Sequence, residues 1–164
     1  MASYWTEGEP HDCCMTVERE EKIRPDLLTK IIPEGVMVFS DGCCFRDSNA
    51  TLRSGIGIAA LEEEDIEILI AEPLQGHQSA QRAEIVAMTK ALEWGEGKII
   101  NLFSDSTYAV GAVVTELPKW KRCGFMAANN KPIKHQEDII ALATAIMKPK
   151  QVAIIKCKGH DTSN

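Results

Sequence analysis

The sequence predicts an α/β fold in which one mixed sheet of five strands is flanked by helices. Residues 36–42 and 99–106 are apolar runs with the β-branched and aromatic content of buried strands, and both run into Phe-Ser-Asp. Residues 54–61 and 66–71 flank the acidic turn 62–65, an arrangement typical of a β-hairpin. We therefore expect the first three strands to be antiparallel and the later strands to run parallel in the same sheet.

Helical periodicity predicts the elements that alternate with these strands. Small apolar residues repeat along one side of the segment 79–94, which Gly95 ends. Asp105 or Ser106 is suited to cap the next helix, and Pro118 is expected to interrupt it. The three predicted helices and the fifth strand occupy residues 79–94, 106–117, 135–147 and 151–156.

Composition indicates a single soluble domain. The chain has 164 residues, 45% hydrophobic and 26% charged, and no apolar run approaches the roughly 20 residues of a membrane span. The N-terminus lacks a basic region followed by an apolar one, so we expect an intracellular protein, cytoplasmic or nuclear.

Residues 1–35 are polar and contain three prolines, which predicts a leader or connecting segment before a domain at 36–164. The six cysteines form no C-x-x-C pair, which predicts reduced thiols.

The net charge of −6 is unevenly distributed along the chain. Residues 1–116 carry 9 basic and 21 acidic side chains, whereas residues 117–158 carry 9 basic and 2 acidic ones. A solvated charged face is the usual meaning of such a run, and a polyanion-binding surface is the alternative. If the chain binds nucleic acid, we expect the basic third to face it.

Three carboxylates are candidates for a metal centre. Asp41 and Asp105 end two similar strands, and ligands of open α/β sheets bind beyond the carboxyl ends of the strands. Glu84 lies on the apolar flank of the first helix, where a carboxylate is costly to bury unless it is paired or coordinates a metal. The alternatives are that each Asp caps a turn or a helix and that Glu84 reaches water at the edge of the stripe. Carboxylates gathered in one crevice suit Mg²⁺, and a pair of ions roughly 3.5–4 Å apart can assist hydrolysis of a phosphodiester.

Three motifs resemble those of the ribonuclease H family: Ser-Asp-Gly at 40–42, Ser-Ala-Gln-Arg-Ala-Glu at 79–84 and Ser-Asp-Ser-Thr-Tyr-Ala at 104–109. The predicted order of strands and helices agrees with that family as well. The sequence is most similar to the ribonuclease H domain of retroviral reverse transcriptases of the gammaretrovirus type, and the resemblance covers nearly the whole chain. It implies the ribonuclease H-like fold for residues 36–164.

The resemblance further implies a metal-dependent endonuclease that cuts the RNA strand of an RNA/DNA hybrid. Asp41, Glu84 and Asp105 match the family's catalytic metal ligands, which would hold two Mg²⁺ ions, with Mn²⁺ as a substitute. His160 matches a histidine that assists proton transfer or product release. The residues that the resemblance places on the hybrid are Gly42, Ser79, Gln81, Thr107 and Tyr108 along the groove, and Lys119, Trp120, Lys121 and Arg122 on a basic protruding helix.

One departure from the family concerns its fourth carboxylate, an Asp on a final helix more than ten residues after the histidine. The printed sequence reaches Asn164 without such a residue, so we expect the C-terminal helix to be missing and cleavage to be reduced. One alternative is a catalytically impaired hybrid-binding or scaffold domain. Another is an integrase- or transposase-type nuclease, which the place of Glu84 between the two aspartates disfavours. We also expect that a polymerase domain precedes the chain in a natural polyprotein.

Overall fold

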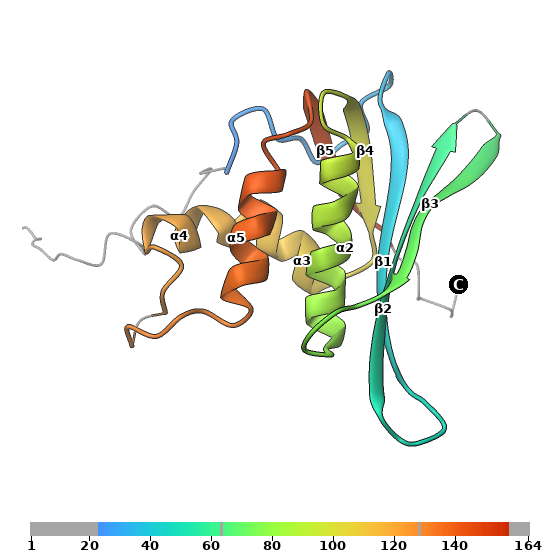
Figure 1. Ribbon diagram of the computed structural model, residues 1–164. Coiled ribbons are helices and arrows are strands. Elements are labelled where there is room, and N and C mark those ends of the chain that lie inside the picture. Colours follow the sequence, from blue (N-terminus) through green and yellow to red (C-terminus); the bar gives the residue numbers. More distant parts are fainter. Residues whose placement is uncertain (1–22, 63, 128, 158–164) are drawn as a thin grey trace, which may run out of the picture.

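The computed structural model describes residues 23–62, 64–127 and 129–157 and contains the mixed sheet that the sequence predicts (Figure 1). The strand order is β3-β2-β1-β4-β5, with the first three strands antiparallel and both β1–β4 and β4–β5 parallel. The predicted fold class is thereby confirmed. The strands are β1 (Val36–Arg46), β2 (Leu52–Glu62), β3 (Asp65–Pro73), β4 (Ile99–Ser104) and β5 (Gln151–Lys156).

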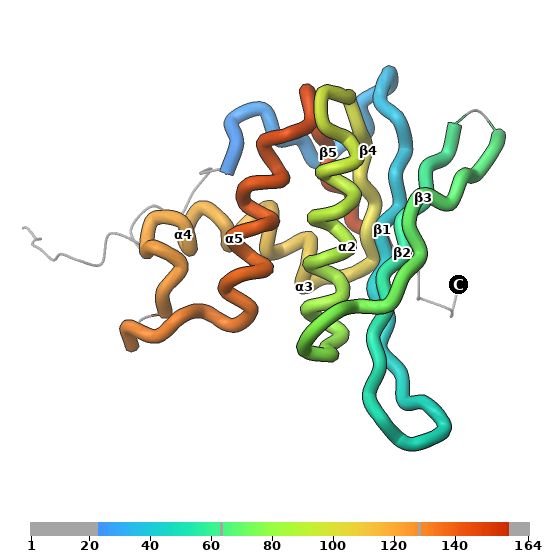
Figure 2. Tube along the Cα trace, in the orientation of Figure 1, coloured from blue at the N-terminus to red at the C-terminus, as the bar shows by residue number. Residues whose placement is uncertain are grey.

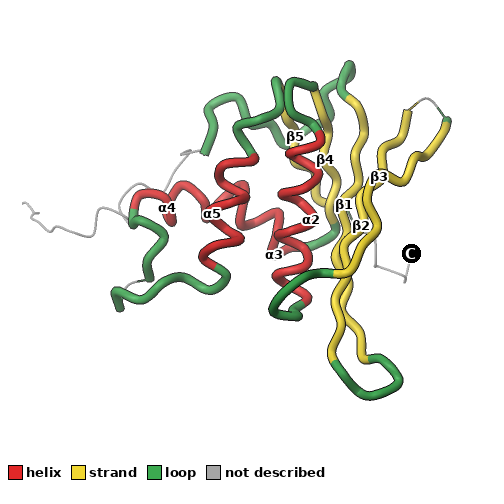
Figure 3. The backbone as a smooth tube through the Cα atoms, viewed as in Figure 1, coloured by secondary structure: helices red, strands yellow, loops and turns green. Residues whose placement is uncertain are grey.

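The helices gather on one face of the sheet, as the red and yellow segments of Figure 3 show. They are α2 (Ala80–Trp94), α3 (Thr107–Gly111), the π-helical turn η1 (Ala112–Glu116), α4 (Leu117–Arg122) and α5 (Gln136–Ala145). α2 packs on β1 on one side and against α5 on the other (Figure 2). Among the described residues, no helix is long and apolar enough to cross a membrane. The opposite face of the sheet exposes apolar side chains, among them Phe39, Ile66 and Ile68.

The chain passes Pro118 without the interruption that the sequence predicts. Ser106 caps α3 as expected, because its Oγ accepts a hydrogen bond from the Ala109 N–H at 3.0 Å. The helix then widens into η1, where the Leu117 N–H donates to the carbonyl of Ala112, five residues back. Proline has no N–H and clashes with the carbonyl four residues back in a regular helix, and the widened turn accommodates it. The predicted helix end at Leu117 is therefore wrong, and α4 continues the chain in helical form.

β1 is longer than the sequence suggests. The sequence places Asp41 at the end of a strand, yet β1 continues to Arg46, and Asp41 pairs with Gly57 of β2. The parallel neighbour β4, in contrast, stops at Ser104, just before Asp105. Asp41 therefore lies in mid-strand, at the level where the parallel half of the sheet ends.

Residues 23–35, which the sequence assigns to the leader, pack against the sheet. Leu28 forms a parallel bridge with Ala153 of β5, so this segment adds a short backbone contact beyond the last strand. Three of its apolar side chains are buried: Ile23, Leu27 and Ile32. The predicted boundary between residues 35 and 36 stays a prediction.

Asn101 attaches this segment to β4, and its replacement by Ala should destabilise the protein. The fully buried Asn101 amide accepts from the Ile32 N–H at 2.6 Å and donates to the Ile32 carbonyl at 2.9 Å. Asn101→Ala leaves both backbone groups without these partners, so we expect the free energy of unfolding in urea to fall by about 3 kcal/mol. Asn49→Ala, at an exposed position, is the control and should change it by less than about 0.5 kcal/mol. An equally small effect of both substitutions would contradict the expectation.

Candidate metal centre and nucleic-acid interface

Asp41 and Asp105 come together because β1 and β4 pair in parallel. The pairing matches Phe39 with Phe103, so the same register carried two residues further sets Asp41 beside Asp105. The rings of Phe39 and Phe103 stack with their centroids 4.9 Å apart and their planes 19° from parallel. Because residues two apart on a strand share a face, Asp41 projects from the same open face as Phe39. The aromatic pair thus lies one row before the two carboxylates.

Glu84 reaches the same point from α2, and Gly42 lets that helix come close. A Cβ on Gly42 would lie 2.6 Å from the backbone carbon of Ala83 and 2.6 Å from the Glu84 nitrogen, so only glycine fits without a shift of the helix. The Gly42 N–H also donates a hydrogen bond to Glu84 Oε1 at 3.2 Å. Gly42 therefore positions Glu84. Its predicted contact with the hybrid stays a prediction.

The three acidic side chains have the donor set of a divalent-cation site. One carboxylate oxygen from each of Asp41, Glu84 and Asp105 lies within 4.8 Å of the other two. Asp41 is exposed and the other two side chains are half-buried, so the cluster is open to solvent. Like charges at this distance repel unless a cation neutralises them, and ligand sets made only of oxygen suit hard ions such as Mg²⁺ and Mn²⁺. The residues present fit such an ion.

Four of the predicted groove residues begin the two helices that adjoin this cluster. Ser79 caps α2 and Gln81 lies half-buried in its first turn, five and three residues before Glu84. Thr107, exposed, and Tyr108, half-buried, start α3 directly after Asp105. Burial, and then the nearby Asp138 carboxylate, raise the pKa of Tyr108, so its phenol remains a hydrogen-bond donor. Two pairs of polar side chains therefore lie within a few residues of Glu84 and Asp105 in the sequence, at the starts of α2 and α3.

The predicted basic residues lie on a different part of the molecule. α4 is at the end of the helical layer that is distant from β1 (Figure 1). Trp120 is half-buried and packs against the hydrophobic core, whereas Lys121 is exposed and Lys119 Nζ lies 3.8 Å from Glu116 Oε1. The structure thus does not bring this helix to the carboxylates. His160 lies outside the described residues.

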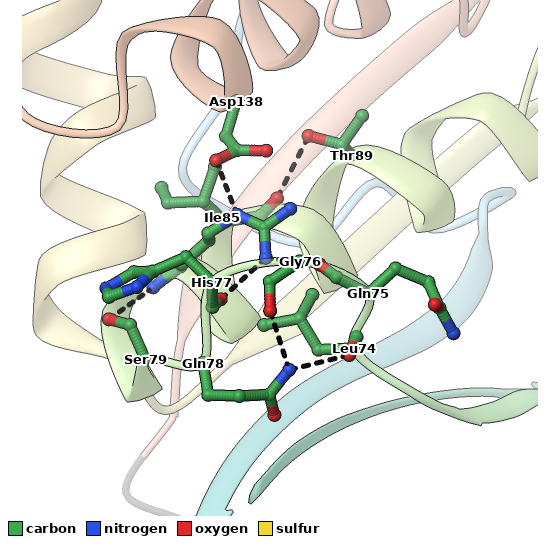
Figure 4. Close-up of polar contacts among 10 residues, drawn as sticks. Leu74, Gln75, Gly76, His77, Gln78, Ser79, Ile85, Thr89 and Asp138 are labelled. Carbon is green, nitrogen blue, oxygen red and sulfur yellow. Dashed lines mark hydrogen bonds and ion pairs between the residues drawn. The ribbon is translucent and has the colours of Figure 1, made fainter. Parts of the chain in front are cut away.

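Sequence reasoning missed Arg82, which links the start of α2 to α5 through Asp138 (Figure 4). A signal was present, because Arg82 is a cation in the first turn of a helix, where the helix dipole disfavours positive charge. Such a residue needs specific acceptors to offset that cost. The sequence could therefore indicate that Arg82 has partners, although it could not identify them.

The carboxylates of β1, of the residue that follows β4 and of α2 meet at a mixed five-stranded sheet, which defines an α/β protein with an acidic centre suited to divalent cations. The family model "RNase H" matches residues 33–164, and the chain belongs to the ribonuclease H family. This family depends in general on divalent metal ions, in agreement with the donor set described above.

The chain is similar to retroviral Gag-Pol polyproteins. The chain is 35% identical over 151 residues to that of avian reticuloendotheliosis virus, covering 92% of the chain and 13% of the polyprotein. It is 36% identical over 152 residues to that of baboon endogenous virus (strain M7), covering 92% of the chain and 8% of the polyprotein. For feline leukemia virus the identity is 33% over 156 residues, with 93% of the chain and 9% of the polyprotein covered. The chain thus spans only about a tenth of the length of these relatives.

Two solved structures show the same fold. A foamy viral protease-reverse transcriptase in complex with an RNA/DNA hybrid aligns with a TM-score of 0.67 at 23% identity, covering 99% of this chain and 20% of that one. The PFV RNase H domain in solution aligns with a TM-score of 0.62 at 27% identity, covering 76% of this chain and 79% of that one. At 23% identity, the similarity to the foamy viral protease-reverse transcriptase shows a shared fold alone.

Replacing Gly42 by Ala should push α2 away from β1. The added Cβ meets helix backbone, which cannot turn aside as a side chain can, so we expect a lower melting temperature and weaker Mn²⁺ binding in calorimetry. Gly111→Ala is the control: a Cβ there has nothing within 4 Å, and the substitution in a helix should keep or raise stability. Wild-type Mn²⁺ affinity in Gly42→Ala would show that the close approach is not needed for the metal centre.

Proposed function

We propose that this chain hydrolyses the RNA strand of RNA/DNA hybrids with Mg²⁺, or Mn²⁺ in its place, at a site for two ions. The observation that carries the proposal is the cluster of Asp41, Glu84 and Asp105, whose ligand oxygens come within 4.8 Å of one another from β1, α2 and the residue that follows β4. Membership of the ribonuclease H family supports it. The similarity to Gag-Pol polyproteins further supports an origin next to a polymerase domain.

Each of the three carboxylates has its own role in this proposal. Bound divalent ions would supply an activated water and stabilise the leaving oxygen of the phosphodiester. Asp41 and Asp105 would hold the ions from neighbouring strands, whose pairing fixes their separation. Glu84 would complete the ligand set from α2, oriented by the Gly42 N–H. His160 would assist proton transfer or product release, as the family resemblance implies.

The proposed substrate follows from the surroundings of the cluster. Ser79, Gln81, Thr107 and Tyr108 offer hydroxyl and amide groups at the starts of α2 and α3, and such groups can recognise the 2′-hydroxyls of an RNA strand in a shallow groove. The foamy viral protein that shares this fold is solved in complex with an RNA/DNA hybrid. The basic side chains of α4 would contact phosphates farther along the duplex.

Asp41→Asn and Asp105→Asn should each abolish metal-dependent cleavage while leaving the fold intact. Each substitution removes one anionic ligand with little change in side-chain size, and relief of carboxylate repulsion should keep the melting temperature of the metal-free protein from falling. The measurement is cleavage of a labelled hybrid in Mg²⁺ and in Mn²⁺, with a DNA duplex and single-stranded RNA as control substrates. A cleavage rate that survives either substitution would refute the metal assignment.

The same assay separates the proposed activity from its main alternative. Cleavage of the hybrid alone supports the nuclease. Binding of the hybrid by the wild-type chain without cleavage in either metal would instead support a hybrid-binding domain.

Lys121→Ala combined with Arg122→Ala should weaken hybrid binding with little dependence on base sequence. Each phosphate contact that is lost should flatten the slope of log affinity against log salt by about 0.7–0.9, measured without divalent ions. Lys148→Ala with Lys150→Ala removes the same charge just before β5, at the opposite end of the parallel strands from Asp105, and should leave the slope unchanged. If the salt slope of the α4 double variant stays as unchanged as that of the control double variant, α4 does not contact the duplex.

A further inference from the structure

Arg82 fixes the segment between β3 and α2 to α5. Its Nε donates to Asp138 Oδ2 at 2.8 Å, and its Nη1 donates to the carbonyls of Gln75 and His77 at 2.6 and 2.7 Å (Figure 4). The Arg82 side chain is only 18% exposed and that of Asp138 only 21%. Three of the five N–H donors of the guanidinium are therefore used within the protein.

Gln78 fixes the same segment from its other side. Its Nε2 donates to the carbonyls of Leu74 at 2.8 Å and Gly76 at 3.0 Å (Figure 4). Its Oε1 accepts from the Ser54 N–H of β2. Arg82 and Gln78 together thus bind four successive backbone carbonyls, those of residues 74–77. These two side chains, together with the buried side chain of Leu74 and its N–H, which donates to the Ser54 carbonyl at 2.8 Å, hold this segment between β2 and α5.

This segment leads directly into the candidate nucleic-acid interface. It ends at Ser79, whose Oγ caps α2, and Gln81 follows in the first turn of that helix. Since a loop with no ladder of its own takes its conformation largely from such side-chain contacts, Arg82 and Gln78 contribute to the direction in which the chain presents Ser79 and Gln81 as it enters α2.

We propose that Arg82 is a positioning residue for nucleic-acid binding, which fixes residues 74–79 so that Ser79 and Gln81 are presented to the hybrid. This inference rests on the proposed function. Arg82 acts through its neighbours, because its Nε and Nη1 donors are directed to Asp138 and to backbone carbonyls. Its loss should therefore change the geometry of the interface without removing a phosphate contact.

Arg24 provides a matched control at the other end of α5. Its guanidinium likewise contacts one carboxylate, that of Asp26, and two backbone carbonyls, those of Ile146 at 2.7 Å and Lys150 at 2.9 Å. Ile146 directly follows α5, whereas Asp138 lies in the first turn of that helix. Removal of either arginine should destabilise the fold through similar losses, but only Arg82 adjoins Ser79 and Gln81.

The experiment compares Arg82→Met with Arg24→Met in the full chain. We expect Arg82→Met to raise the Kd for the hybrid, and the KM for its cleavage, by about tenfold relative to Arg24→Met, which is the scale of one lost polar contact. The Mn²⁺ affinity should equal that of Arg24→Met, because the three carboxylates remain. The salt slope of hybrid binding should also stay at the wild-type value.

Two further variants keep the inference testable if Arg82→Met folds poorly. Gln78→Ala releases the same segment from the opposite side and should raise the Kd in the same way, again with an unchanged salt slope. Arg82→Lys keeps the charge but cannot reach three acceptors with the fixed fork of a guanidinium, so it should not restore affinity.

Each contrary result has a distinct meaning. A flattened salt slope in Arg82→Met that Lys restores would overturn positioning in favour of a direct phosphate contact. Equal Kd values for the Arg82 and Arg24 variants would overturn the inference while leaving the proposed function intact. A wild-type chain that binds no hybrid would overturn the proposed function and this inference with it.

Discussion

The parallel pairing of β1 with β4 is the constraint on which the rest of the structure depends. It sets Asp41 beside Asp105 through the backbone ladder, so the separation of the two carboxylates is chosen by strand register. The stacked rings of Phe39 and Phe103 occupy the preceding row and add an aromatic contact of about 0.5–1.5 kcal/mol to the pairing. Two acidic groups that repel each other are therefore brought together by the backbone pairing of the strands that carry them.

The third carboxylate requires a helix to approach the sheet closely, and small residues make that possible. Gly42 on β1 faces Ala83 on α2, which is fully buried, as are Ala87 and Ala91. Small side chains bury less apolar area than large ones and so contribute less to stability. Arg82 and Gln78 add hydrogen bonds to the carbonyls of residues 74–77, and these bonds hold the segment that precedes α2. Stability and position are thus supplied by different residues of the same helix and its leading segment.

Patterns in the sequence predicted those features that neighbouring residues control. The two Phe-Ser-Asp strands and the helix of Glu84 were foreseen, and their carboxylates do meet. The sequence did not predict that the helix continues past Pro118. Helix propensities describe a regular α-helix, and the π-helical turn η1 departs from that geometry. The length of β1 depends on β2, a partner outside the local window. The sequence could indicate that Arg82 needs acceptors but not which ones, since two of them are backbone carbonyls, which are the same for every residue type.

The uneven charge of the chain acquires a physical meaning in this fold. The acidic cluster alone repels a polyanion, whereas the basic side chains of α4 lie at the distant end of the helical layer. Charges separated by more than about 8 Å are largely screened at physiological salt, so in the proposed function the distant α4 would act on a duplex independently of the acidic cluster. In the proposed function, binding energy then comes from phosphates at α4, and cleavage takes place where cations neutralise the carboxylates. Under that proposal, the acidic cluster would concentrate negative charge for metal binding, while the distant α4 would supply affinity for nucleic acid.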